Sequence, residues 1–356
     1  MAYLFSGNPQ PGSPNPSALT ALLILGMALP ASSLLGDAPA RVPVAETRHF
    51  AFYSDFESNL NDALIAAGVA RRFSKPELFR AGAEAGCFAK LPEAVRAGWD
   101  GATDYYAKIV SPSGSNSTQR FLIRVQIAGF DEDLKTPGDR QFVEIARSLR
   151  AAAAPAYRAC RWAAQDGENR RWIEELKPGL VSDEEKVGPR LEKLYGTKWT
   201  GLPIPVDVVQ TVDYSGANTI LRGPGSGHIL IAIENPQRAA VETVFHEASH
   251  LLMGRGAPVQ KALEEAATAV GFRLPGDLWH VVLFYTTGET VRRVLDDGHE
   301  PKYVPMLYEI YDRGTWAQYR KPLESAWLPY VKGERSLGDA AAALIETLRT
   351  PALFTF

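Results

Sequence analysis

Residues 246 to 250 read His-Glu-Ala-Ser-His, within a run whose apolar residues recur with the 3.6-residue period of an α-helix. On such a helix the two histidines stand one turn apart on the same side. The opposite side is aliphatic and comprises Val241, Val244, Ala248 and Leu251. The segment is therefore expected to bury its aliphatic side in a core and to turn His246 and His250 toward a cleft.

Signals on both sides of this run set its limits. The run from Ile229 to Ile233 is strand-like, and Glu234-Asn235-Pro236 predicts a turn into the helix. Gly254 and Gly256 predict the end of the helix. The stretch 223 to 227 holds three glycines and one proline, but it lacks a lysine and is not followed by a helix. It therefore predicts a mobile rim of the cleft and not a loop that cradles phosphate.

The spacing of the two histidines favours metal binding, because imidazoles one turn apart can reach a single ion. Glu247 falls on the flank of the pair, where its carboxylate can accept a proton from water activated by that ion. The alternative without chemistry is a helix with two core or surface histidines and a helix-favouring glutamate. The residues around the pentad favour the metal site.

These residues resemble the zincin metallopeptidases over about residues 195 to 295. The longer pattern of that family has Thr or Val three positions before the first histidine, uncharged residues around the pair, and a hydrophobic residue two after the second. The matching residues are Thr243, Val244, Ala248, Ser249, Leu251 and Leu252. The resemblance implies that His246 and His250 bind zinc and that Glu247 is the general base. It also implies that the strand from Ile229 to Ile233 is an edge strand that can pair with a peptide substrate.

A catalytic zinc site needs a third protein ligand and one position open to water. The candidates downstream of the motif are Glu264, Glu265, His280 and Glu289. Glutamate-type zincins take this ligand from a later helix, but Glu264 and Glu265 follow His250 by only 14 and 15 positions, sooner than is usual in that group. In the expected helix 259 to 272, Glu264 lies at the margin of the buried face and Glu265 points away from it.

His280 lies on the next expected helix, about 276 to 295, within an apolar stripe. Burying a histidine there is costly unless hydrogen bonds or a metal satisfy its nitrogens. It follows His250 by 30 positions, within the range of glutamate-type zincins although the residue type differs. Its other possible roles are a hydrogen bond to the oxyanion, which Tyr285 could share, or a core histidine bonded to a backbone carbonyl. Glu289 lies on the opposite side of this helix.

The composition is that of an ordinary globular protein, with 46% hydrophobic and 22% charged residues. At 356 residues the chain exceeds the usual size of one domain. We expect an N-terminal tail over 1–40, an α+β lobe over 41–185 and a zincin-like region over 186–356. The net charge of −3, with no basic run interleaved with aromatics, argues against nucleic-acid binding.

The first forty residues resemble a secretory signal. The apolar run from Ala18 to Leu29 is too short to span a bilayer comfortably, and Ala38-Pro39-Ala40 offers a small-residue cleavage site. No Lys or Arg precedes Arg41, so a Pro/Ser-rich tail is the alternative. We expect a secreted or periplasmic protein with no stable membrane span after removal of the signal. Cys87 and Cys160 can form one disulfide or remain two buried thiols.

The remaining patterns predict an α+β protein that is mainly helical. In the N-terminal half we expect strands at 49–53 and 121–130, helices at 54–70, within 76–110 and within 139–176, a polar loop at 111–118, and a stop at 177–179. In the C-terminal half we expect a short helix at 189–195, strands at 205–212, 220–222 and 228–233, and a last helix at 338–348. Helices around a small sheet and the motif helix suit this fold class. His228 is expected at the surface.

The segment from 303 to 330 is rich in aromatic residues, which are expected to wall a core. They are Tyr303, Tyr308, Tyr311, Trp316, Tyr319, Trp327 and Tyr330. Tyr303 and Tyr311 are weak candidates for hydrogen bonding to a transition state. The sequence thus predicts a Zn²⁺-dependent hydrolase that acts on a peptide or protein substrate. The alternatives are an inactive zincin-like protein that binds metal or peptide, and a structural protein with core histidines.

Overall fold

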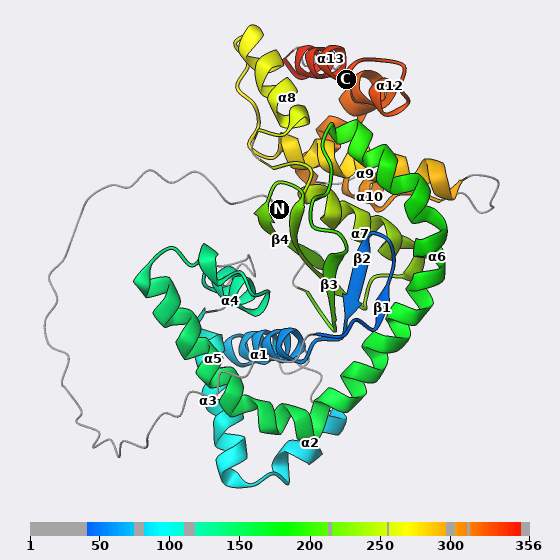
Figure 1. Cartoon of the computed structure of the whole chain (residues 1–356). Helices are drawn as coiled ribbons and strands as arrows, with labels where there is room; N and C mark the ends of the chain where they lie inside the picture. Colours follow the sequence, from blue (N-terminus) through cyan, green and yellow to red (C-terminus); the bar gives the residue numbers. More distant parts are fainter. Residues whose placement is uncertain are drawn as a thin grey trace, which may run out of the picture. The chain divides into compact units, whose positions relative to one another are not determined.

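One mixed β-sheet organises the part of the chain that the structure, a computed structural model, describes: residues 41–74, 82–109, 118–212, 216–254, 256–296, 303–311 and 314–349. The strands follow the order β1-β2-β3-β5-β4. Their bounds are β1 Ala45–Glu46, β2 Phe50–Tyr53, β3 Ile204–Val209, β4 Ala217–Gly223 and β5 Ser226–Ala232. Strands β2, β3 and β5 are parallel, and β1 and β4 are antiparallel to their neighbours. The small sheet and the many helices confirm the mainly helical α+β prediction (Figure 1).

Both faces of the sheet are buried, which explains why β3 and β5 are almost continuously apolar. Val206 and Val208 pair in register with Ile229 and Ile231, and these side chains belong to the main core. The alternate residues, such as Val209 and its partner Ala232, belong to a second core on the other face.

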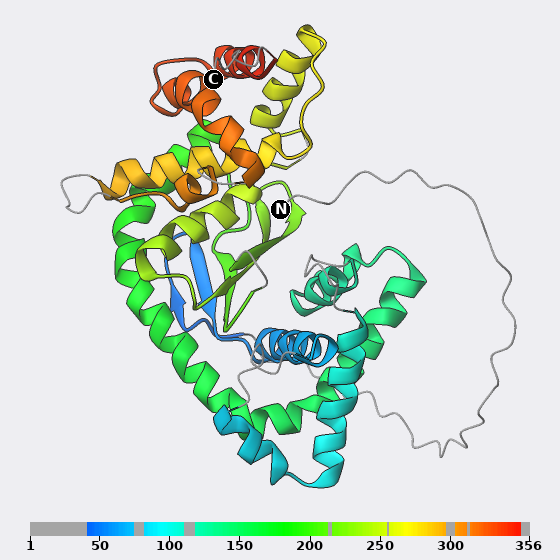
Figure 2. The ribbon, with the colours of Figure 1, turned by 180° about the vertical axis from the view of Figure 1, so that it is seen from behind.

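Helices α7 (Gln237–His250) and α6 (Ala163–Tyr195) pack against the first face. Helix α6 has 33 residues, or about 50 Å of helix, and it curves along the sheet in both views (Figures 1 and 2). It ends at Gly196, whose positive φ of 67° forms the left-handed cap.

The predicted stop at 177–179 is wrong, because α6 continues through Pro178 and Pro189. Leu176, Leu180 and Leu191 are buried on both sides of these prolines. This continuous packing outweighs the lost hydrogen bonds, and prolines inside a helix are a recognised cause of bending. The predicted short helix at 189–195 is the last part of α6.

Helices α1 (Phe56–Arg72), α4 (Thr118–Ile127) and α5 (Pro137–Tyr157) lie on the other side of the sheet. The strand predicted at 121–130 is wrong, because most of it belongs to α4 and the chain turns at 128–129. Arg120 and Arg124, one helical turn apart, are both buried in this lobe, and Arg124 lies 3.6 Å from Asp62 of α1. The buried arginines recur with the period of a helix, so their burial beside Asp62 favours helix α4 over the strand that the alternation of apolar residues predicted.

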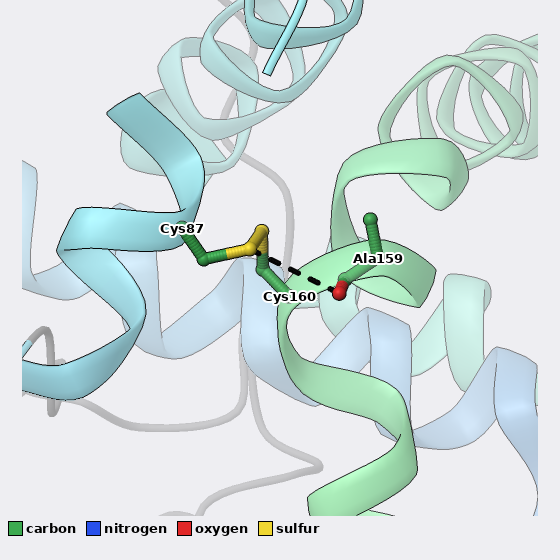
Figure 3. The surroundings of a disulfide bond; sticks show 3 residues. All are labelled: Cys87, Ala159 and Cys160. Atoms are coloured by element: carbon green, nitrogen blue, oxygen red, sulfur yellow. Dashed lines mark hydrogen bonds between the residues drawn. A yellow bond between two sulfur atoms is a disulfide. The ribbon is translucent and has the colours of Figure 1, made fainter. Parts of the chain in front are cut away.

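Helices α2 (Gly82–Ala89) and α3 (Glu93–Ile109) complete the N-terminal helices, whose core includes Trp99, Tyr106 and Tyr157. A disulfide joins Cys87 of α2 to Cys160 (Figure 3). Cys160 lies in η3 (Arg158–Trp162), a π-helical segment between α5 and α6. The structure thus selects the disulfide from the two alternatives that the sequence left open. The loop expected at 111–118 lies outside the described residues, except for its last one.

The C-terminal elements gather at one end of the sheet, next to α9 (Figure 2). Their bounds are α8 Pro258–Ala269, α9 Leu278–Leu295, α10 Met306–Tyr311, η4 Gly314–Tyr319, α11 Arg320–Pro322, η5 Leu323–Trp327, α12 Leu328–Val331 and α13 Leu337–Arg349. Tyr303, Tyr311, Trp316, Tyr319 and Trp327 are buried in the main core, which confirms the predicted aromatic wall at these positions.

Residues Pro43–Phe356 form one compact unit. The boundary expected between residues 185 and 186 falls inside α6, and strands from both sides of it share the sheet. The expected signal over 1–40 lies outside the described residues. Within the described ranges, no helix combines the length and apolar character that crossing a membrane requires.

Candidate metal site

A fixed turn leads from β5 into α7 and thereby positions the histidine pair. The side chain of Asn235 donates hydrogen bonds to the carbonyls of Gly216 and Ala232, and it accepts one from the Thr243 hydroxyl at 3.2 Å. Pro236 is the N-cap of α7. This confirms the turn predicted at 234–236, and α7 begins directly after it.

Three imidazoles converge at one point, two from α7 and one from α9. The Nε2 atom of His246 lies 3.2 Å from that of His250 and 3.4 Å from that of His280. One ring nitrogen of each histidine lies within 4.8 Å of the others. The three side chains can therefore hold one metal ion, and His280 is the third member of the set.

Aromatic rings surround the three imidazoles on the α9 side. Phe284 packs on His246 with 3.7 Å between ring centroids, and Trp279 stacks on His280 at 5.0 Å. Trp316 meets His280 edge to face, and its indole donates a hydrogen bond of 2.7 Å to Asp277. These contacts restrict the rotation of the imidazoles, so they keep the nitrogens converged.

Burial also determines the charge of the cluster. It lowers the pKa of His250 to about 4. Burial, together with repulsion from the neighbouring imidazoles, lowers the pKa values of His246 and His280 well below the ordinary value. The three rings are therefore neutral at neutral pH, which is the form that binds a metal ion.

Glu247 directly follows His246 in α7. It is buried, with 6% of the residue exposed. Burial raises its pKa to about 7, and a hydrogen bond with Thr219 opposes that shift. The Thr219 hydroxyl lies 2.5 Å from Oε2 of Glu247 and 2.9 Å from its backbone oxygen. A carboxyl group in such surroundings can both accept and release a proton near neutral pH.

The C-terminal end of α7 is attached to two other elements. The Thr219 hydroxyl of β4 lies within hydrogen-bond distance of the carbonyl oxygen of Glu247, and the indole of Trp199 donates to that of Ala248 at 2.9 Å. The last carbonyls of a helix lack partners within the helix, so such bonds stabilise its end. They hold the pentad against the sheet.

Neither of the downstream glutamates in α8 is part of this cluster. Glu264, which the sequence also nominated as a metal ligand, is exposed and accepts a hydrogen bond from Gln260. Glu265 is exposed 3.7 Å from Lys261. Glu289 is buried, but it forms an ion pair with Arg292 at 2.6 Å. Glu264 and Glu265 stay outside the cluster because α8 turns their carboxylates to solvent, whereas α9 packs directly on α7 and brings His280 to the pair.

The tyrosines proposed for catalysis are buried in the main core. Tyr285 is fully buried, with its ring near that of Tyr311. The hydroxyl of Tyr311 donates to the carbonyl of Val281, and that of Tyr303 donates to buried Glu242 at 2.5 Å. The structure therefore gives Tyr303 and Tyr311 core partners and places Tyr285 among core residues.

Two sequence interpretations near the sheet need correction. The strand β5, which contains Ile229 and Ile231, lies between β3 and β4, so the edge strand beside α7 is β4. His228 is 2% exposed and lies 3.2 Å from buried Asp207, so it is a core residue and not a surface one. The stretch 223 to 227 holds the two-residue turn of the β4–β5 hairpin, Pro224-Gly225, and the strand residues next to it.

Sequence reasoning missed Thr219 and Trp279, and it predicted Trp316 only as part of the aromatic wall. Thr219 carries no local signal because its importance depends on the packing of β4 against α7. Trp279 adjoins His280 in sequence, and its position within the stripe of α9 was a usable signal. No family model, curated protein or solved structure that was compared with this chain matches it.

Proposed function

We propose that the chain is a zinc-dependent peptidase with a zincin-like core. The observation that carries this proposal is the convergence of three neutral imidazoles beside the buried carboxyl group of Glu247. His246, His250 and His280 would hold the zinc ion, and Glu247 would be the general base. The combination suits metal-assisted hydrolysis better than it suits a core of packed histidines.

The donor set and its spacing fit zinc. Zinc–nitrogen bonds of about 2.0–2.1 Å in a tetrahedral arrangement separate two nitrogens by about 3.4 Å. The two separations given above, 3.2 and 3.4 Å, agree with this value. Three protein ligands also leave one tetrahedral position for water or substrate, as catalytic zinc sites require.

A bound zinc ion would supply Lewis acidity to water and to the scissile carbonyl. Glu247 would accept a proton from the attacking water and would then pass it to the nitrogen of the leaving amine. The aromatic rings of Phe284 and Trp316 would limit bulk water around the imidazoles. The outer edge of β4 would bind the peptide substrate by strand pairing.

Metal content is the first test. Protein purified without added metal should contain zinc close to one equivalent, measured by inductively coupled plasma mass spectrometry. His280→Ala should weaken zinc binding by more than about 100-fold, because loss of a ligand exceeds the loss of an outer-shell group. Glu264→Ala is the matched control and should retain the metal. Absence of zinc from the wild-type protein would support a structural role for the histidines.

Glu247→Gln tests the assigned general base. This variant keeps the size of the side chain, so it should retain zinc while hydrolysis of a quenched-fluorescence peptide library falls by about 100- to 10,000-fold. Glu265→Gln, an exposed carboxylate on α8, should leave turnover unchanged. Activity that survives in Glu247→Gln rejects this role. Stoichiometric zinc without cleavage of any peptide would favour a binding protein that recognises a peptide strand.

A further inference from the structure

Thr219 links the edge strand to the proposed general base. Its hydroxyl lies within hydrogen-bond distance of two atoms of the same residue, the side-chain Oε2 of Glu247 at 2.5 Å and the backbone oxygen at 2.9 Å. Thr219 pairs in register with Ile229, whose side chain faces the core that contains α7. The hydroxyl therefore reaches Glu247 from the sheet and not from the motif helix.

From this geometry we propose that Thr219 is the positioning residue for Glu247 and that it holds the carboxyl group throughout the reaction. A hydroxyl has one hydrogen to donate and lone pairs to accept with. When Glu247 is a carboxylate, the Thr219 hydroxyl donates to Oε2. When the other carboxyl oxygen of Glu247 carries the proton taken from water, Oε2 still accepts the hydrogen bond from Thr219.

The contact thus persists in both states of Glu247, and Thr219 neither gains nor loses a proton overall. The β-branched side chain of threonine restricts rotation about its first side-chain bond, so the hydroxyl stays in place. Thr219 is also part of β4, one of the two edge strands of the described sheet. A peptide bound along β4 would adjoin the strand that fixes the general base.

This inference rests on the proposed function, and its test uses Thr219→Val and Thr219→Ser in the full-length protein. Valine keeps the shape and removes the hydroxyl. We expect kcat to fall by about 10- to 100-fold, because a small displacement of a catalytic group has effects of this size. KM and zinc content should stay within about twofold of wild type, since zinc binding and strand pairing do not use the hydroxyl. Thr219→Ser should recover most of kcat.

Thr290→Val is the matched control for removal of a threonine hydroxyl, because the Thr290 hydroxyl bonds to a carbonyl of its own helix, that of Thr286. It should keep the wild-type kcat. Wild-type turnover in Thr219→Val would overturn the inference. A parallel loss of zinc in Thr219→Val, or failure of Thr219→Ser to recover kcat, would equally overturn it by indicating a structural role.

Crystal structures of wild type and Thr219→Val supply a measurement that does not depend on activity. The Glu247 carboxyl group should leave its wild-type position in Thr219→Val and keep it in Thr219→Ser. An unmoved carboxyl group in Thr219→Val contradicts the inference. If wild type binds no zinc and cleaves no peptide, the proposed function fails, while the crystal structures still decide whether Thr219 holds Glu247.

Discussion

Glu184 joins helix α6 to the turn between β1 and β2 and is only 3% exposed. Its carboxylate accepts hydrogen bonds from the backbone amides of Arg48 and His49 at 3.1 and 3.2 Å, and it lies 3.3 Å from Nδ1 of His49. Burial alone would raise the pKa of Glu184, but hydrogen bonds from His49, Thr47 and these amides outweigh it, so the pKa is lowered. The charged form is therefore the stabilising one.

The contribution of Glu184 to stability should depend on pH. A carboxyl group with a lower pKa in the folded protein stabilises it above the ordinary glutamate pKa of about 4.3, and this contribution is lost as the pH falls. Glu184→Gln should lower the free energy of unfolding at pH 7 by about 1–3 kcal/mol. The deficit should narrow below about pH 4.

Urea unfolding at pH 7, 5 and 3.5 measures this deficit. Glu185→Gln is the matched control, because Glu185 adjoins Glu184 but its ion pair with Arg48 is exposed. Such a pair contributes about 0–1 kcal/mol. A deficit of Glu184→Gln that is the same at all three pH values contradicts this account.

At the scale of elements, α6 approaches the turn between β1 and β2 so closely that one position admits no side chain. A Cβ atom at Gly188 would lie 2.8 Å from Nε2 of His49. The His49 ring cannot easily move, since it is held by Glu184 and meets Trp199 edge to face. Gly179, in the same helix, has nothing within 4 Å of the corresponding position.

The two glycines of α6 should respond oppositely to alanine. Gly188→Ala should reduce the free energy of unfolding by about 1–3 kcal/mol through overpacking. Gly179→Ala should increase it by about 0.5–1 kcal/mol, because alanine favours the helix and nothing obstructs its methyl group. Thermal and urea unfolding measure both. Equal effects of the two substitutions would show that Gly188 is not a close-approach position.

At the scale of the whole molecule, the described residues contain one disulfide, and it links α2 to η3 (Figure 3). It joins Cys87 to Cys160 across 73 positions, so it restricts a long loop of the unfolded chain. The three imidazoles belong to α7 and α9, which are not part of that loop. The disulfide should therefore affect stability and leave the metal site intact.

The double variant Cys87→Ser/Cys160→Ser should be less stable than wild type by about 2–4 kcal/mol, measured by urea unfolding. Its zinc content should equal that of wild type. Adding a reductant to wild type should reproduce the loss of stability, and adding it to the double variant should leave stability unchanged. Loss of zinc in the double variant would show that the disulfide also supports the metal site.

Disulfides persist mainly in oxidising compartments, so this one supports our proposal that the chain is exported. Fractionation of expressing cells, with N-terminal sequencing of the mature protein, tests that proposal. Recovery of the protein only from the cytosol with both thiols reduced would reject it.

Much of the fold could be predicted because its signals are local. The strands β2, β3 and β5, the helices α1, α7 and α9 and the last helix α13 all lie close to the predicted ranges. Each has a hydrophobic period that the packed core preserves. The predictions failed where contacts with residues distant in sequence determine the secondary structure. In α4, for example, buried Arg124 lies next to Asp62 of another helix.

The residues of the candidate site also fall into two groups, those that the sequence predicted and those that only the tertiary structure identified. The sequence alone determined that His246 and His250 share one side of a helix with Glu247 on its flank, because four residues make about one helical turn. It could not choose between Glu264 and His280, and it gave no reason to consider Thr219. Those residues are distant in sequence, and only the packing of α9 and β4 against α7 brings His280 and Thr219 to the pair. Long-range packing depends on how whole faces of the elements fit together, and no local period encodes that fit.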